Sequence, residues 1–323
     1  MPRFRNPWPD SEPRGAADLF RWLVERRTRP RAPSPPRGSF PVAVPEILRP
    51  RAPDGVVSAT WIGHSTVLVQ LGGLNLITDP VFSPRASPVQ WLGPRRVMDP
   101  GLGLGELPPL DLVLLSHNHY DHLDRSSVRH LARAHPEATW IVPLGLGRYL
   151  RGWGPRRIVE LDWWGGTTVA GARITATPAR HFSARGPGDR NRSLWCGFVV
   201  EAGGRRVFFA GDTAYHPEFG RVGAELGPFD LALIPIGAYD PRWFMHVVHV
   251  DPEEAVQVYR DLTAPHQDRP LPVMLALHWG TFRLTDEPMD EPPRRAAAAW
   301  RAAGLPEERL WVARFGETRR VAG

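Results

Sequence analysis

Apolar positions recur along this chain with the period-two alternation, or in the short continuous runs, that predict β-strands. Helix-type patterns separate several of these runs. The predicted strands lie at residues 57–70, 74–78, 112–116, 140–143, 158–161, 169–178, 195–201, 206–210, 231–236 and 273–278. The first two form a predicted hairpin around Gly72 and Gly73. The pattern indicates one α/β domain at residues 55–323, with more strands than a simple doubly wound sheet needs.

Three segments of this domain carry helix signals. In the clearest, Asp251 is a helix N-cap, Pro252 occupies the first helical position and Glu254 completes a capping box, before an amphipathic run at residues 255–262. Two further predicted helices lie at residues 126–134 and 293–303. No stretch of 18 apolar residues occurs, so the sequence predicts no membrane-spanning helix.

The first 54 residues differ from the rest in composition. They contain 12 of the 36 prolines, which predicts an extended arm without a core of its own. One helix is predicted at residues 16–27, with four apolar side chains on one face: Leu19, Phe20, Leu23 and Val24. That face either packs on the body of the protein or lies on a membrane, and packing is the commoner outcome.

Composition and charge place the chain among soluble globular proteins. It has 323 residues, of which 42% are apolar and 23% charged, and all 40 basic residues are arginine. The net charge is +6, and the arm accounts for +5 of it, with 11 arginines against six acidic residues. An arm of this charge suits an anionic surface, either lipid head groups or nucleic acid.

The single cysteine, Cys196, excludes an internal disulfide framework and a thiolate zinc cluster, and we expect it to be a small buried residue. No short apolar segment follows the first basic residues, so no secretory signal is predicted. A cytoplasmic location follows as an expectation.

The most informative segment is residues 117–122, which follow a predicted strand and place three imidazoles and one carboxylate in one turn: His117, His119, Asp121 and His122. Nitrogen and oxygen ligands without a thiolate suit zinc, and also iron or manganese. The spacing allows His117 and His119 to hold one ion and Asp121 and His122 a second. The alternative is a surface histidine cluster without a metal.

A site for two ions needs further ligands at strand ends, and three candidates satisfy this requirement: His181, Asp212 and His278. Each is a weak signal alone. Together they complete seven ligands in four segments, with His117, His119 and His181 on one ion, and Asp121, His122 and His278 on the other. Asp212 would bridge two ions that lie about 3.5–4 Å apart.

This ligand set resembles that of the metallo-β-lactamase superfamily. Longer strings resemble one branch of it, the N-acylphosphatidylethanolamine-hydrolysing phospholipases D. They are Asn-Pro-Trp-Pro at 6–9, Thr-Trp-Ile-Gly-His-Ser-Thr at 60–66, and the segments at 78–83, 161–164, 234–245, 249–255 and 278–282. The resemblance covers almost the whole chain. It implies a four-layer αββα sandwich with two zinc ions at the edge of its two sheets.

The resemblance also implies an activity, the hydrolysis of N-acylphosphatidylethanolamine-like lipids to N-acylethanolamine and phosphatidic acid. Asp121 would take a proton from the attacking water, and Tyr120 would hydrogen-bond the phosphate or the leaving oxygen. Tyr120, His278 and Gln90 match positions that contact the lipid. The residue after Gln90 is Trp91, where the family pattern has tyrosine, so the fit of the head group differs there.

Asp79 and His64 match positions near the metal. Asp79 either orients a ligand imidazole or caps the turn that it forms with Pro80. Four arginines flank His181, and they either grip phosphate or belong to a solvated loop: Arg180, Arg185, Arg190 and Arg192.

The resemblance sets expectations about partners as well. A phospholipid is the expected substrate, no nucleic acid is expected, and a homodimer and a peripheral association with the inner membrane face through the arm follow from the animal family. Two alternatives stay open: a hydrolase of the same fold acting on a lactone or another phosphodiester, and a non-catalytic, metal-stabilised membrane-binding protein. The mixed His/Asp ligand set with a bridging carboxylate argues against the second, because structural zinc sites are closed and often rich in cysteine.

Overall fold

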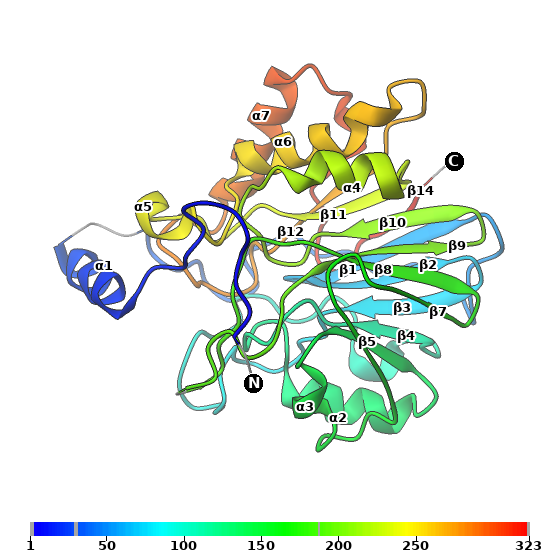
Figure 1. Ribbon diagram of the computed structural model, residues 1–323, viewed down its shortest axis with the longest axis horizontal. Coiled ribbons are helices and arrows are strands. Elements are labelled where there is room, and N and C mark those ends of the chain that lie inside the picture. The colour runs from blue at the N-terminus through cyan, green and yellow to red at the C-terminus, as the bar shows by residue number, and fades with distance from the viewer. Residues whose placement is uncertain (1–2, 29–31, 187, 322–323) are drawn as a thin grey trace.

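Two seven-stranded mixed sheets form the centre of the molecule (Figure 1). The computed structural model describes residues 3–28, 32–186 and 188–321. The first sheet has the order β14-β1-β2-β3-β4-β5-β6. Its strands are β1 (Val57–Gly63), β2 (Thr66–Leu71), β3 (Leu74–Thr78), β4 (Leu112–Leu114), β5 (Thr139–Pro143), β6 (Arg157–Leu161) and β14 (Thr318–Val321).

The second sheet has the order β13-β12-β11-β10-β9-β8-β7. Its strands are β7 (Gly166–Val169), β8 (Ala172–Thr177), β9 (Gly197–Ala202), β10 (Arg205–Phe209), β11 (Leu231–Pro235), β12 (Val273–Leu277) and β13 (Leu310–Trp311). In both sheets an antiparallel half is joined to a parallel half, since β3, β4, β5 and β6 run parallel, as do β10, β11, β12 and β13.

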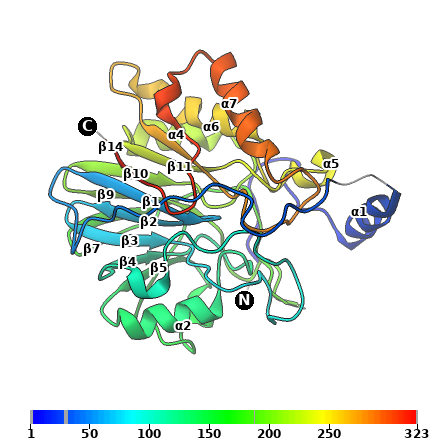
Figure 2. The ribbon, with the colours of Figure 1, turned by 180° about the vertical axis from the view of Figure 1, so that it is seen from behind.

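Helices cover the outer face of each sheet, which gives four layers (Figures 1 and 2). One side carries α4 (Glu218–Leu226), α6 (Pro252–Thr263) and α7 (Glu291–Ala302), and the other carries α2 (Arg125–Ala134) and α3 (Gly147–Leu150). Two helices lie at one end of the sandwich, α1 (Ala16–Thr28) and α5 (Arg242–Met245). The αββα architecture expected from the resemblance is confirmed.

Side chains on the two faces of the first sheet belong to two separate hydrophobic cores. Leu112 and Leu114 of β4 join the large cluster between the sheets, whereas Val113 between them joins the cluster under α2 with Val128 and Trp140. Successive side chains of a strand point to opposite faces, so a strand buried on both faces has to be apolar throughout. This explains the continuous apolar runs from which the strands were predicted.

Most predicted elements are present, and the differences lie at turns and in short elements. The run at 57–70 is two strands, because the chain turns at His64, whose φ is 56°. The run at 169–178 is the end of one hairpin strand and the whole of the next, with a turn at Ala170 and Gly171. No element was predicted at α3, α4, α5, β13 or β14; four of these are two to four residues long, and α4 contains two glycines, which weaken a helix signal.

The helix of the arm packs on the body, but through a different face from the one expected. Trp22 is buried and donates its indole N–H to Asp286 at 2.5 Å, and Arg26 pairs with the same carboxylate at 2.7 Å. The apolar side chains expected to pack, Leu19, Phe20, Leu23 and Val24, are exposed instead. Within the described ranges, no helix is long and apolar enough to cross a membrane.

The capping box of α6 is present as expected and gives a test of the fold. Asp251 accepts a hydrogen bond from the backbone N–H of Glu254 at 2.9 Å. We expect Asp251→Ala to lower the free energy of unfolding by about 1 kcal/mol in urea titration, because the helix loses its N-terminal acceptor. Asp251→Asn keeps an acceptor at the cap and should recover most of that loss. Equal losses in the two variants would assign the effect to the ion pairs of Asp251 with Arg242 and Arg295 instead.

Candidate metal centre

The candidate ligands come from loops that follow four strands and converge at one edge of the sandwich. Residues 117–122 follow β4 of the first sheet, whereas His181, Asp212 and His278 follow β8, β10 and β12 of the second. The structure brings all seven together, and the groups that can share an ion have ligand atoms within 4.8 Å of one another. Residues from both sheets therefore face one another across a single site, as expected for strand-end loops in an α/β protein.

Three imidazoles form the first half of the site, which we call the three-histidine group: His117, His119 and His181. The Nδ1 of His119 lies 2.8 Å from the Nε2 of His117 and 3.2 Å from the Nε2 of His181. The far nitrogen of His181, Nδ1, donates to the carbonyl oxygen of Val248 at 2.7 Å. That bond fixes the tautomer and leaves the Nε2 lone pair directed at the site.

The second half, the carboxylate group, consists of Asp121, His122 and His278. The Oδ2 of Asp121 lies 3.3 Å from the Nε2 of His122 and 3.4 Å from the Nε2 of His278. His64 lies behind this group and contacts Asp121 through its Nε2 at 2.9 Å. His64, which matched a position near the metal, thus contacts one of the candidate ligands.

Asp212 lies between the two groups. Its Oδ2 is 3.0 Å from the Nε2 of His122 and 3.1 Å from the Nε2 of His278, and 3.9 and 4.0 Å from those of His117 and His181. The side chain is buried, and Oδ1 has no hydrogen-bond partner. A carboxylate whose Oδ2 lies within 4.0 Å of nitrogens from both groups, with Oδ1 still free to bind, has the placement of a bridging ligand.

Asp79 holds one imidazole of the site from behind. Its carboxylate accepts from the Nδ1 of His122 at 2.6 Å, and from the hydroxyl and the backbone N–H of Ser116 at 2.6 and 2.7 Å. These bonds go to the neighbouring strand end, and none of them caps the turn with Pro80. Of the two roles considered for Asp79, the geometry favours the orientation of His122.

Backbone strain gathers at the same place. His64, Asp79 and His278 have φ values of 56°, 33° and 63°, in the left-handed region that non-glycine residues rarely adopt. Such residues cost about 1–3 kcal/mol each and persist only where the surroundings fix them.

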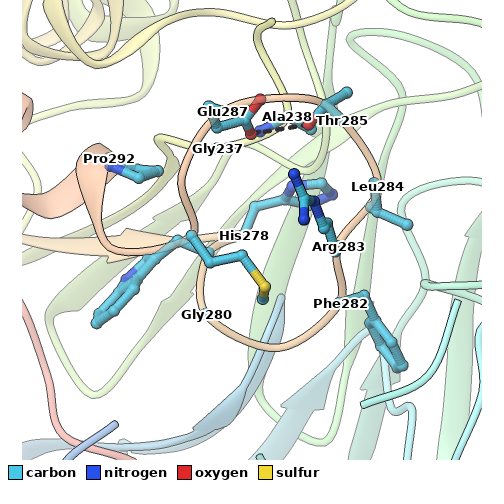
Figure 3. A pocket seen from close by; sticks show the side chains of 12 residues that line it. Gly237, Ala238, His278, Gly280, Phe282, Arg283, Leu284, Thr285, Glu287 and Pro292 are labelled. Atoms are coloured by element: carbon cyan, nitrogen blue, oxygen red, sulfur yellow. Dashed lines mark hydrogen bonds between the residues drawn. The ribbon is translucent and has the colours of Figure 1, made fainter. Parts of the chain in front are cut away.

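Figure 3 shows how residues 280–287 curve around His278, with the buried Glu287 accepting hydrogen bonds from the backbone of Ala238 and from Thr285.

His119, His181 and Asp212 have the protonation states that metal ligands need, whereas His278 would have to release a proton to bind a cation. Burial lowers the pKa of His119 to about 3 and that of His181 to about 4. Burial alone would raise the pKa of Asp212, but His122 and His278 hold it well below its usual range. Burial alone would lower the pKa of His278, but Asp212 and Asp121 raise it to about 9. Neutral imidazoles and ionised carboxylates are the forms that bind cations, and the two carboxylates here lie close enough to share one positive charge.

The donor set fits metal ions better than it fits a network of hydrogen bonds. The Nε2 atoms of His122 and His278 lie close to Asp212 yet are not hydrogen-bonded, and the three nitrogens of the three-histidine group face one another. Unpaired buried polar atoms are rare in proteins because each is costly. Two divalent ions held by the three-histidine group and the carboxylate group would satisfy these atoms together.

Tyr120, within the ligand segment, and Gln90 line one cavity, whose wall includes none of the seven candidate ligands. Tyr120 donates its hydroxyl to the carbonyl oxygen of Arg185 at 2.8 Å. The side-chain amide of Gln90 bonds within its own loop, accepting from the backbone N–H of Arg85 at 3.0 Å.

Three of the four arginines near His181 neither grip the centre nor lie free in a solvated loop, whereas the fourth, Arg192, is exposed. Arg180 donates to the carbonyl of Asp10, Arg190 to that of Pro13, and Arg185 to those of Asn118 and Leu123. Because each carbonyl belongs to the arm or to the segment around the metal ligands, these side chains brace the loop of His181 against both.

His249 was not singled out as a site residue in the sequence, although it faces the centre. Its ring is buried, its Nε2 is 4.0 Å from Asp212, its Nδ1 has no partner, and it forms a potential ligand group with His181 and Asp212. The available signal was its place two residues before the helix N-cap Asp251. A helix start at a sheet edge often presents functional groups, but many histidines share that position.

The arm contributes to the centre through Asn6. Its side-chain N–H donates to the backbone carbonyl of His181 at 2.9 Å, and its Oδ1 accepts from the indole of Trp195 at 3.0 Å. Trp8 of the same segment stacks on the buried ring of His216, at 4.5 Å between centroids. The first residues of the arm therefore fix the backbone that carries one candidate ligand.

We expect Asn6→Ala to weaken metal binding about 10–100-fold, as measured by competition with a chelator, because loss of a group that orients a ligand has an effect of that size. Asn6→Asp keeps the acceptor for Trp195 but loses the donor to His181, so it should behave like Asn6→Ala. If both variants keep the metal affinity and only unfold at a lower temperature, the segment is a clamp without influence on the centre.

Comparison with known proteins agrees with this geometry. Residues 74–279 match the β-lactamase superfamily domain. An uncharacterised protein of Mycobacterium tuberculosis is 43% identical over 284 residues, which are 87% of this chain and 73% of that protein. The N-acyl-phosphatidylethanolamine-hydrolyzing phospholipase D 1 of Caenorhabditis elegans is 42% identical over 236 residues, 70% of this chain, and the alignment spans 64% of the nematode protein.

Among solved structures, the metallo hydrolase Igni18 from Ignicoccus hospitalis superposes with a TM-score of 0.60 at 23% identity, covering 83% of this chain and 99% of that one. At this identity the likeness concerns the fold. The chain therefore belongs to the β-lactamase superfamily, as a metal-dependent hydrolase of the metallo-β-lactamase fold whose relatives include N-acyl-phosphatidylethanolamine-hydrolyzing phospholipases D.

Proposed function

We propose that this hydrolase is a two-zinc phosphodiesterase of the phospholipase D type, acting on N-acylphosphatidylethanolamine-like lipids; iron or manganese would fit the same ligands. The observation that carries the proposal is Asp212, buried between the three-histidine group and the carboxylate group. The nematode and yeast relatives, named for the hydrolysis of this lipid, supply the substrate class. The alignments span 64% and 58% of those relatives, so the substrate comes to this chain by proposal.

A phosphodiester resists hydrolysis because its negative charge repels the nucleophile and its alkoxide is a poor leaving group. Two bound divalent ions would supply the missing chemistry, since they acidify water and neutralise charge on the phosphoryl oxygens. His117, His119 and His181 would hold one ion, Asp121, His122 and His278 the other, and Asp212 both. Asp79 and His64 would keep His122 and Asp121 in place through the contacts of 2.6 and 2.9 Å described above.

The remaining roles fall to groups that face the centre. Asp121 is ionised, because His122 beside it outweighs the effect of burial and holds its pKa well below the usual range; we assign it the proton of the attacking water. His249 is a neutral ring, since burial keeps its pKa well below the usual range, and one N–H can donate to a phosphate oxygen. Tyr120 would contact the phosphate or the leaving oxygen after releasing the carbonyl of Arg185.

In the proposed reaction, water attacks phosphorus, the bond between phosphorus and the N-acylethanolamine oxygen breaks, and phosphatidate retains the oxygen from water. We expect vesicles of N-acylphosphatidylethanolamine to be hydrolysed faster than phosphatidylethanolamine, a bis-aryl phosphate or a lactone. In heavy-oxygen water the label should enter phosphatidate, and label in the N-acylethanolamine would refute attack at phosphorus. Preference for the lactone over every phosphodiester would favour the alternative substrate.

Asp212→Asn is the matched control for this assay. It keeps the shape of the side chain but loses the bridging charge, so turnover should fall to background while circular dichroism stays that of the folded protein. Unchanged activity in the folded variant would favour a non-catalytic, metal-stabilised module.

Long acyl chains imply contact with a membrane, and we extend the proposal to a peripheral association at the inner membrane face. The apolar face of α1 points to solvent, with Phe20 68% exposed, and Trp91 in the loop that contains Gln90 is 76% exposed. Each segment contacts an element next to a candidate ligand: α1 contacts Asp286 of the loop that curves around His278, and the loop of residues 83–90 lines one cavity with Tyr120. An exposed apolar face beside an entrance suits lipid, and the positive arm suits anionic head groups.

We expect Phe20→Glu combined with Leu23→Glu to lower binding to phosphatidylglycerol-containing vesicles at least tenfold in sedimentation, because two charges would enter the lipid interface. Val44→Glu, at an exposed apolar position beside β14, is the control and should bind like the unaltered protein. Equal binding by all three proteins would contradict the membrane role of α1. Sedimentation velocity without lipid tests the expected homodimer separately.

A further inference from the structure

The cavity lined by Tyr120 and Gln90 is strongly basic. It has a volume of about 700 Å³, and its wall includes Tyr120, Gln90 and Trp153 together with four arginines: Arg125, Arg129, Arg133 and Arg185. The one acidic residue in this wall is Asp124. Its carboxylate caps α2 by accepting from the backbone of Ser126 at 3.1 Å, and it also accepts from Ser127 and Ser83. The charges of the four arginines therefore exceed the charge of the one carboxylate in the wall.

The charges of three of these arginines destabilise the helix that carries them. Arg125, Arg129 and Arg133 are four residues apart on α2, so they share one face and repel one another. Arg125 is the first residue of α2, where the helix dipole disfavours a positive charge. Within the described chain none of the three has a carboxylate partner, whereas Arg221 and Arg295 on other elements do. An anionic ligand would relieve this repulsion.

Aromatic rings and backbone carbonyls connect the basic wall to the metal loop. The guanidinium of Arg185 lies 3.9 Å from the ring centre of Tyr120, and the guanidinium groups of Arg185 and Arg125 lie 5.6 and 5.8 Å from that of Trp153. Arg185 also donates to the carbonyl of Asn118 at 2.9 Å, inside the ligand segment. The cavity and the metal centre thus share the wall formed by Tyr120 and Arg185.

We propose that this cavity is an anion subsite that takes a second phosphate group, while the first phosphate occupies the metal centre. The inference rests on the proposed function, because the metal centre has to accept a phosphodiester. Guanidinium groups bind phosphate through paired N–H donors, and the α2 arginines present several such pairs on one surface. The second phosphate belongs either to the same substrate molecule or to the head group of a neighbouring anionic lipid.

The subsite also sets where the acyl chains go. A hydrocarbon chain in this cavity would remove water from unpaired guanidinium groups without replacing their hydrogen bonds, which is unfavourable. The chains therefore leave the centre on the side of α1, and the α2 side receives charged groups.

Binding by the metal-loaded protein tests the inference without requiring turnover. In the first experiment, calorimetry compares the affinities of alkyl monophosphates with those of α,ω-alkanediol bisphosphates of three to eight carbons. In the second, sedimentation compares binding to phosphatidylcholine vesicles with and without phosphatidylglycerol. The variant is R129Q/R133Q, in which glutamine preserves helix propensity. The control is R301Q/R320Q, which removes the same charge from two exposed positions on α7 and β14.

We expect at least one bisphosphate to bind tenfold or more tightly than its monophosphate, and R129Q/R133Q to lose this advantage while the control retains it. If the advantage is absent but R129Q/R133Q alone loses the effect of phosphatidylglycerol, the second phosphate comes from a neighbouring lipid. If the variant and the control behave alike in both experiments, the subsite does not exist. Absence of hydrolysis with an intact bisphosphate advantage would reject the proposed function and leave the subsite standing.

Discussion

The structure depends on the convergence of buried imidazoles and carboxylates around Asp212. Burying ionisable groups without hydrogen-bond partners is unfavourable, and here several ring nitrogens and one carboxylate oxygen are left without such partners at one point. Cations that accept all these lone pairs turn that unfavourable arrangement into a binding site. The chemistry of the protein and the stability of its sheet edge therefore depend on the same atoms.

The fold serves this convergence in several ways. The two sheets pack face to face, so that the loops after β4, β8, β10 and β12 reach one point at an edge of the sandwich. Strained backbone at His64, Asp79 and His278 aims these side chains inward. Asp79 holds His122 from behind, and Asn6 ties the arm to the loop of His181. The basic wall at α2 and the exposed apolar face of α1 give the protein two different surfaces, one suited to phosphate and one to lipid.

Sequence reasoning reached most of the strands, the main helices and the four candidate ligands at 117–122 because each leaves a local signal, whereas His181, Asp212 and His278 became candidates only together with that segment. Apolar runs mark strands buried on both faces, and His117, His119, Asp121 and His122 are adjacent in the chain. The positions of His249 and Asn6 could not be derived in this way, since their roles arise from contacts 37 and 175 residues away along the chain. The outward face of α1 was missed for a related reason: Trp22 and Arg26 find Asp286, a partner remote in sequence, and this contact overrides the preference of the helix to bury its apolar side.

The central claim is that two metal ions lie on either side of Asp212, held by the three-histidine group and the carboxylate group. Anomalous X-ray diffraction from crystals of the purified protein, recorded at the zinc, iron and manganese absorption edges, tests it most directly. The account predicts two anomalous peaks, about 3.5–4 Å apart and each next to one oxygen of Asp212. A fully loaded protein with a single peak, or with peaks away from Asp212, would contradict it.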